Sequence, residues 1–171
     1  LISGTSHLYE MHIACPNTGE YYERFVKLAE GRIALLPFRK FSFKALYFLY
    51  NYVKKNGIDL LHSHGKGAGF YSRLITVLIR IPAIHTPHGI SDSKREDFIH
   101  KVYIYFEKMF GFLISAVVYV SNTEAERAAD IGIWSNVRSK VIFNGTGIVS
   151  EGQRLHWRKF MLEKHGWKEE K

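Results

Sequence analysis

The sequence predicts a Rossmann-like, doubly wound α/β fold, in which a mainly parallel sheet carries helices on both faces. Two observations lead to this prediction. Short apolar runs alternate with segments of helical length, and turns containing glycine or asparagine follow many of the runs. Between residues 58 and 90, two apolar runs flank a segment long enough for a helix, which is the strand–helix–strand order of a parallel sheet. At 171 residues the chain is too short for two full α/β domains.

Six apolar or β-branched runs are predicted to be strands. The run AVVYV is continuous and β-branched, as expected of a strand that is buried on both faces. The first run alternates between apolar and polar residues and ends at Pro16-Asn17, which favours a strand leading into a loop. The predicted strands span residues 9–15, 33–36, 60–64, 83–86, 116–120 and 141–143.

Five segments are predicted to be helices, at residues 43–55, 67–80, 94–112, 123–131 and 151–165. Ser42 is a suitable N-cap for the first of them, and Asn56-Gly57 ends it. Ser93 and Asn122 are expected to cap the third and the fourth helix. The last helix is polar.

Positive charge is concentrated in one part of a chain whose formal net charge is +8. Between Gly31 and Ile58, six basic residues alternate with aromatic residues, and there is no acidic residue. One interpretation is a helix whose aromatic stripe faces the sheet while its lysines are solvated. Another is contact with an anionic membrane surface through residues 39–55. Nucleic acid is not an expected partner, because no nucleic-acid-binding motif accompanies the charge.

The remaining composition favours a cytoplasmic location. The single cysteine, Cys15, excludes an intramolecular disulfide and suits a reducing compartment. No signal peptide is recognisable, and the longest uncharged apolar run, residues 109–120, is shorter than the roughly 20 residues of a spanning helix. If residues 39–55 contact lipid, we expect a peripheral position at the inner face of the plasma membrane.

Histidines gather where two predicted strands end. His62 and His64 are two residues apart on one strand, so their side chains should point to the same face. His85 and His88 follow on the next strand along the chain, where His85 is expected to be structural. The four imidazoles could supply zinc ligands. We expect no metal. Apart from Asp59 and Asp92, no carboxylate or cysteine lies near the histidine pairs, and the spacing of the histidines on the strands also fits packing without a metal.

Glycines follow the first histidine pair in the segment GKGAG, residues 65–69. A helix that begins here would present open backbone N–H groups to an anion such as a phosphate. The segment lacks the Gly-Lys-Ser/Thr ending of a P-loop. Tight packing of the helix against the strand explains the glycines equally well.

Taken together, these segments resemble the N-terminal domain of the family 4 glycosyltransferases, which are retaining enzymes of GT-B architecture. The matching segments occur in the family's order along most of the chain. They are DLLHSH (59–64), KGAGF (66–70) with Arg73, PAIHTPHG (82–89), Glu107, Val120-Ser121, Gly132 and KVIFNG (140–145).

The resemblance implies roles for particular residues. His88 is expected to be catalytic, because the histidine of the T-x-H-G motif lies near the transferred sugar in this family. Substrate contacts are expected from His62, His64, Gly65, Lys66, Gly67, Gly89, Ser121, Asn144 and Gly145. For Ser121-Asn122, a helix cap is the alternative, and for Asn144-Gly145 a turn that tolerates positive φ. No cofactor is implied, since the nucleotide sugar is a substrate.

The implied activity is a hexosyltransferase that moves a sugar from a nucleotide sugar to a saccharide or lipid-linked acceptor. The pathway would build capsule, lipopolysaccharide, other cell-surface polysaccharide or glycolipid. Residues 1–150 correspond to the N-terminal domain without its first strand and glycine-rich loop, and residues 151–171 to the start of the interdomain region. The donor-binding second domain is expected to be missing, so we expect the chain alone to be inactive. The alternative is a non-catalytic α/β module that binds a glycan or a lipid phosphate.

Overall fold

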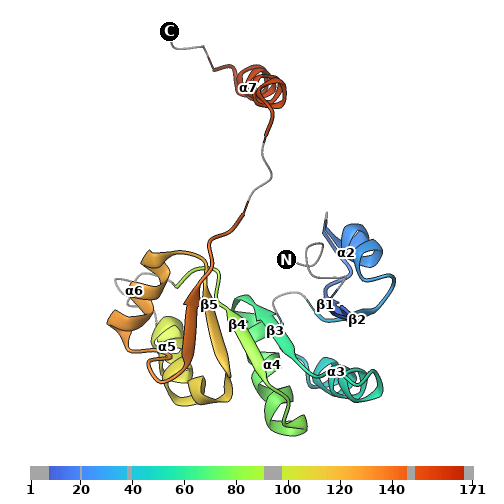
Figure 1. Cartoon of the computed structure of the whole chain (residues 1–171), viewed down its shortest axis with the longest axis vertical. Coiled ribbons are helices and arrows are strands. Elements are labelled where there is room, and N and C mark those ends of the chain that lie inside the picture. Colours follow the sequence, from blue (N-terminus) through green and yellow to red (C-terminus); the bar gives the residue numbers. More distant parts are fainter. Residues whose placement is uncertain (1–7, 20, 38–39, 91–97, 146–148, 168–171) are drawn as a thin grey trace.

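The computed structural model describes residues 8–19, 21–37, 40–90, 98–145 and 149–167, and Figure 1 shows their arrangement. Strands alternate with helices along the chain, as predicted. The strands are β1 (Ile13–Cys15), β2 (Ile33–Leu35), β3 (Leu61–His64), β4 (Ala83–Thr86), β5 (Ala116–Tyr119) and β6 (Arg138–Val141). The helices are α2 (Tyr22–Leu28), α3 (Phe43–Lys55), α4 (Gly65–Ile79), α5 (Phe98–Phe110), the short 3-10 helix η1 (Gly111–Leu113), α6 (Asn122–Ile131) and α7 (Glu151–His165).

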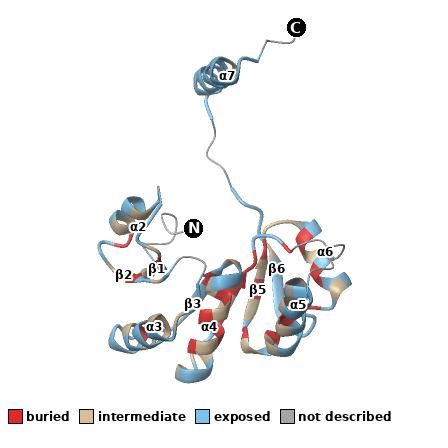
Figure 2. Ribbon diagram, turned by 180° about the vertical axis from the view of Figure 1, so that it is seen from behind, coloured by how far each residue is buried: buried red, intermediate tan, exposed pale blue. Residues whose placement is uncertain are grey.

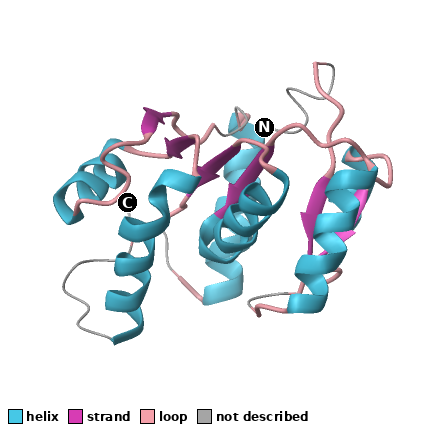
Figure 3. Cartoon of the chain, turned by 90° about the horizontal axis from the view of Figure 1, so that it is seen from below, coloured by secondary structure: helices cyan, strands magenta, loops and turns pink. Residues whose placement is uncertain are grey.

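All the strand pairings are parallel, which confirms the predicted fold class. Strands β3, β4, β5 and β6 form one sheet in that order, and β1 pairs with β2 in a second, smaller sheet. Among the described residues, β1 and β3 do not pair with each other. Figure 3 shows the helices running alongside the strands.

The predicted element boundaries hold best where the local signals are strongest. Helices α3 and α7 and strand β4 have the predicted limits. Ser42 caps α3 as expected, because its hydroxyl oxygen accepts a hydrogen bond from the Ala45 N–H at 3.3 Å. The predicted cap at Ser93 lies outside the described residues.

Strand β1 is shorter than the predicted 9–15, two further predictions are wrong, and one element was missed. The last strand spans Arg138–Val141 rather than residues 141–143, because an edge strand can carry exposed polar residues and so lacks an apolar run. Ser121, and not Asn122, caps α6, since its hydroxyl accepts from the Glu124 N–H at 3.1 Å. Helix α2 was not predicted, because it is short, buries no residue completely and has no side-chain cap.

Two apolar clusters form the core. One lies around β5 and α6 and consists of Ile90, Ile114, Val117, Tyr119, Ala128, Ile133 and Trp134. The other joins β2, α3 and α4 and consists of Ala34, Leu49, Val53, Tyr71 and Ile75. The first cluster includes Val117 and Tyr119 of β5 and also Ile90, which follows β4 in the chain.

A buried ion pair joins helices α4 and α5. Arg73 and Glu107 are each 1% exposed, and the Arg73 guanidinium donates a hydrogen bond to Glu107 Oε2. Trp134 Nε1 donates to the same oxygen at 2.9 Å. Burial raises the pKa of Glu107, while the adjacent guanidinium and the indole N–H act in the opposite direction. Each charge therefore depends on its partner for its place in the interior.

Helix α7 extends away from the sheets (Figure 1), and nearly all its residues are exposed (Figure 2). Its start is stabilised locally by a capping box between Ser150 and Gln153. No helix in the described part of the chain combines the length and the apolar character needed to cross a bilayer.

Replacing Glu107 with Gln should lower the free energy of unfolding by about 3–5 kcal/mol, because the Arg73 charge would stay buried without its counterion. Urea denaturation measures the change. The same substitution at the exposed Glu23 of α2 is the control and should change stability by less than about 0.5 kcal/mol. Equal stability of the Glu107→Gln variant and the native protein would contradict a structural role for the ion pair.

Candidate functional site

Strands β3 and β4 bring three histidines together at their carboxyl ends. His64 Nδ1 and His88 Nε2 are 2.8 Å apart, so one imidazole donates a hydrogen bond to the other. The rings of His62 and His64 lie 4.3 Å apart, and His62 Nε2 bonds to Thr86 Oγ1 at 2.9 Å. The structure therefore places His62 and His64 on one face and His88 at the same edge of the sheet.

The backbone after β4 aims His88 at this cluster. In the β3–β4 register His64 lies opposite Thr86, and His88 follows two residues later. His88 has φ = +54°, a conformation uncommon for a non-glycine residue, and Gly89 follows with φ = +112°. A non-glycine residue with positive φ is energetically unfavourable, so this conformation persists only where the surrounding structure holds it in place.

Glu124 of α6 holds that turn. Its carboxylate accepts the Gly89 N–H at 2.5 Å through Oε1 and the Val120 N–H at 2.9 Å through Oε2. The side chain is 5% exposed, so both hydrogen bonds are protected from water. Sequence reasoning did not assign a role to Glu124. The S-x-x-E pattern of Ser121 and Glu124 was a signal, although the carboxylate bonds here to Val120 and Gly89 rather than to the cap residue.

His85 lies on the other face of the sheet, as a structural residue. It is fully buried and its Nδ1 lies 2.9 Å from Ser63 Oγ, which in turn accepts from Ser72 Oγ at 3.1 Å. A Cβ on Gly69 would come within 2.7 Å of the His85 ring, so tight packing explains this glycine. Among the described residues, no three histidine, cysteine or acidic side chains are arranged to hold a metal ion.

A cavity of about 350 Å³ adjoins the histidine-bearing turn. Four of the predicted site residues line it: His88, Gly89, Ser121 and Asn144. Sequence reasoning did not foresee two further charged lining residues, Glu124 and Arg127. A larger hollow of about 630 Å³ lies on α3, but no histidine or carboxylate lines it. We therefore regard the smaller cavity as the candidate site.

The structure separates the other predicted residues from this cavity. Gly65 has φ = +77° at the junction of β3 and α4, which gives a local reason for a glycine. The Lys66 amine lies 4.3 Å from the centre of the Tyr103 ring on α5. Gly67 has open space where a side chain would extend, and Gly145 is exposed. None of these residues lines the cavity, and neither do His62 and His64, which reach it only through the hydrogen bond from His64 to His88.

Two histidines of the cluster, His62 and His64, favour the uncharged form. Burial, followed by the charges that His62 and His88 would carry, lowers the pKa of His64 to about 4. Burial and the neighbouring His88 also lower the pKa of His62. Neutral imidazoles both donate and accept hydrogen bonds, which suits recognition of hydroxyl groups. The chemistry that this edge supports is therefore the binding and orientation of a polyhydroxylated ligand.

In open parallel α/β sheets ligands bind at the carboxyl ends of the strands, which is where this domain has its polar groups. Residues 5–147 match the family description "Glycosyltransferase Family 4". The chain therefore belongs to this family, as its motifs predicted, and represents a GT-B glycosyltransferase domain.

Individual relatives agree with this assignment. The chain is 28% identical over 149 residues to an "Uncharacterized 41.2 kDa protein in cps region" of Klebsiella pneumoniae, covering 81% of this chain and 40% of that protein. It is 29% identical over 94 residues to the O-antigen biosynthesis glycosyltransferase WbnH of Escherichia coli, covering 54% of this chain and 28% of that protein. The chain thus spans less than half the length of these relatives.

A solved structure supports the fold. The crystal structure of a glycosyltransferase from Rickettsia africae ESF-5 superimposes with a TM-score of 0.63 at 13% identity. The match covers 98% of this chain and 45% of that one.

Replacing Glu124 with Gln should lower the free energy of unfolding by about 1–3 kcal/mol, because the amide has only one acceptor oxygen and leaves one backbone N–H unpaired. Amide hydrogen exchange should become faster at Gly89 or Val120. The control is Glu126→Gln, an exposed position on the same helix that should leave both rates unchanged. Unchanged exchange in the Glu124→Gln variant would refute the role of Glu124 in holding the turn.

Stability should fall as the pH is lowered from about 6.5, the usual pKa of an unfolded histidine. Burial, followed by the charge of Arg73, lowers the pKa of His85 to about 3 in the folded state, so the unfolded state binds the additional proton. Below about pH 6.5, this residue alone should lower the free energy of unfolding by about 1.4 kcal/mol for each pH unit. Urea denaturation at pH values from 7 to about 5 measures the slope of the free energy of unfolding against pH. The slope should be shallower in His85→Asn and unchanged in His156→Asn, a substitution on exposed α7.

Proposed function

We propose that this chain is the acceptor-side domain of a retaining glycosyltransferase. The enzyme transfers a hexose from a nucleotide sugar to a saccharide or lipid-linked acceptor during synthesis of capsule, lipopolysaccharide or a related cell-surface glycan. The observation that carries the proposal is the hydrogen bond that holds His88 against His64 at the cavity, in a chain of Glycosyltransferase Family 4. The names of the relatives, from a cps region and from O-antigen biosynthesis, support the choice of pathway.

His88 is the proposed catalytic residue. Its imidazole lies at the cavity and is oriented by the hydrogen bond to His64, so it can bond to a hydroxyl of the transferred sugar. Such a bond strengthens as charge develops at the anomeric carbon, and this lowers the barrier. Gly89 has no side chain, so the backbone beside His88 stays accessible to the substrate.

The remaining groups position the acceptor. Ser121 and Asn144 line the cavity with His88 and offer hydrogen bonds to sugar hydroxyls. The start of α4 at Gly65, Lys66 and Gly67 would accept a phosphate of a lipid-linked acceptor. The donor would be held by a second domain, and the departing diphosphate would assist the incoming hydroxyl on the same face of the sugar. Positioning and electrostatic stabilisation supply the rate enhancement, without a protein nucleophile or a cofactor.

In the full-length enzyme, His88→Ala should lower kcat by about 100-fold or more, because a hydrogen bond that is strongest in the transition state is lost. KM should change much less. Steady-state kinetics with the nucleotide-sugar donor measures both values, and circular dichroism confirms folding. His156→Ala is the matched control and should retain activity.

An unchanged kcat in a folded His88→Ala variant would reduce His88 to a structural role. Glycan binding by the full-length protein without turnover of any nucleotide sugar would favour the alternative, a non-catalytic binding module.

A further inference from the structure

The outward side of helix α5 is apolar although no part of the described chain covers it. Five apolar side chains recur every three or four residues from α5 into η1, so they form one stripe: Phe98, Val102, Tyr105, Met109 and Phe112. Phe98 is 80% exposed, Tyr105 64% and Phe112 76%. The opposite side of α5 packs into the protein through Ile104, Phe106 and Glu107. The helix therefore has one apolar side toward the core and another toward solvent.

The charges on the outward side of α5 are positive. Lys101 and Lys108 are exposed beside the apolar stripe. Glu107 is the only acidic residue of α5, and it is buried against Arg73. The one acidic residue of α5 therefore lies on the buried side of the helix.

Helix α3 repeats this combination. Phe43 is 79% exposed and Tyr47 70%, one turn apart, while Leu49 and Val53 occupy the core positions. The aromatic residues at 43 and 47 therefore do not face the sheet, which was one of the expectations for this segment. Lys44 and Lys54 are exposed, and α3 contains no acidic residue.

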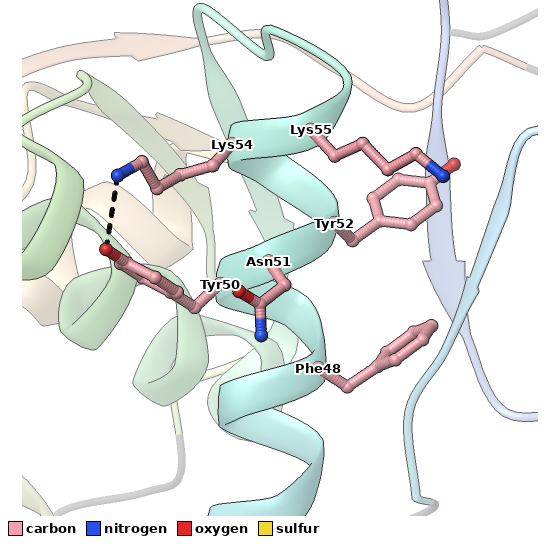
Figure 4. A pocket seen from close by; sticks show the side chains of 6 residues that line it. All are labelled: Phe48, Tyr50, Asn51, Tyr52, Lys54 and Lys55. Atoms are coloured by element: carbon pink, nitrogen blue, oxygen red, sulfur yellow. Dashed lines mark hydrogen bonds between the residues drawn. The ribbon is translucent and has the colours of Figure 1, made fainter.

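The hollow of about 630 Å³ lies along α3 (Figure 4). Phe48 and Tyr52 point to one side of the helix, and Tyr50 and Lys54 to the other. Lys54 Nζ donates a hydrogen bond to the Tyr50 hydroxyl at 3.4 Å. The Tyr50 ring and the Lys54 ammonium, on the same side of the helix, form a surface that suits an anionic headgroup.

Helices α3, α4 and α5 belong to one layer, with α4 between the other two. The Phe41 ring, just before α3, contacts Phe70 of α4 with centroids 5.1 Å apart. Phe70 contacts Phe106 of α5 at 5.3 Å. Much of the outward surface of α3 and α5 is exposed in Figure 2. We call this the basic–aromatic face, defined by Phe43, Lys44, Tyr47 and Lys54 of α3 with Phe98, Lys101, Tyr105 and Lys108 of α5 and Phe112 of η1.

We propose that the basic–aromatic face binds the surface of an anionic lipid bilayer. The exposed aromatic rings would enter the interface between headgroups and acyl chains, and the lysines would meet anionic headgroups. A second copy of the chain is disfavoured as the occupant, because two such faces would bring only positive charges together. This proposal does not depend on the proposed transferase activity, so a result that overturns one of the two proposals does not affect the other.

The purified protein should co-sediment with vesicles of phosphatidylcholine and phosphatidylglycerol, and much less with vesicles of phosphatidylcholine alone. Higher salt should weaken the binding, because it screens the lysines. Lys101→Gln and Lys108→Gln should each lower partitioning about fivefold. The triple variant Phe98→Ser, Tyr105→Ser and Phe112→Ser should lower it by about tenfold or more, since the inserted apolar area is lost.

The matched control is Trp157→Ser with Lys159→Gln, which removes an exposed aromatic residue and a lysine from α7. Circular dichroism verifies that each variant is folded. Loss of binding in the α7 variant but not in the α5 variants would overturn the proposal, as would equal binding to neutral vesicles. Self-association without lipid that the α5 variants abolish would assign the face to a second copy and would also overturn it.

Discussion

The parallel pairing of β3 with β4 is the constraint on which the rest of the site depends. Because His64 lies opposite Thr86, the carboxyl ends of the two strands are level, and the turn that follows β4 brings His88 back to His64. The same turn is held from the other side by Glu124, which reaches it from α6. The imidazole pair is therefore a product of sheet register together with one carboxylate, and the cavity lies where these elements meet.

The two-residue period of a strand gives β3 two different roles. His62 and His64 point to one face, with their rings 4.3 Å apart, and belong to the histidine cluster. Ser63, between them, points to the other face and bonds to the buried His85. Four histidines within a short stretch of sequence thus separate into three at the carboxyl edge of the sheet and a single member of the core. This separation explains how one histidine-rich segment contributes both to packing and to the proposed site.

Helix α5 joins the interior to the proposed membrane surface. Its buried side contributes Glu107 to the ion pair with Arg73, and its outward side carries lysines and exposed rings. The ion pair holds the helix against α4, and because Glu107 is the only acidic residue of α5, this helix presents no negative charge on its outward side.

The sequence by itself determined the parallel α/β class, the limits of α3, β4 and α7, the cap at Ser42 and the common face of His62 and His64. These depend on periodicity and on contacts between residues a few positions apart, which a sequence displays directly. Only the tertiary structure decided that Glu124 holds the turn at Gly89 and which aromatic residues of α3 remain exposed. The Glu124 contact joins residues 35 positions apart, and exposure depends on which neighbours pack against a helix. Strand β6 was misplaced for a related reason: it is held by backbone hydrogen bonds to β5, and these leave no apolar pattern in an exposed edge strand.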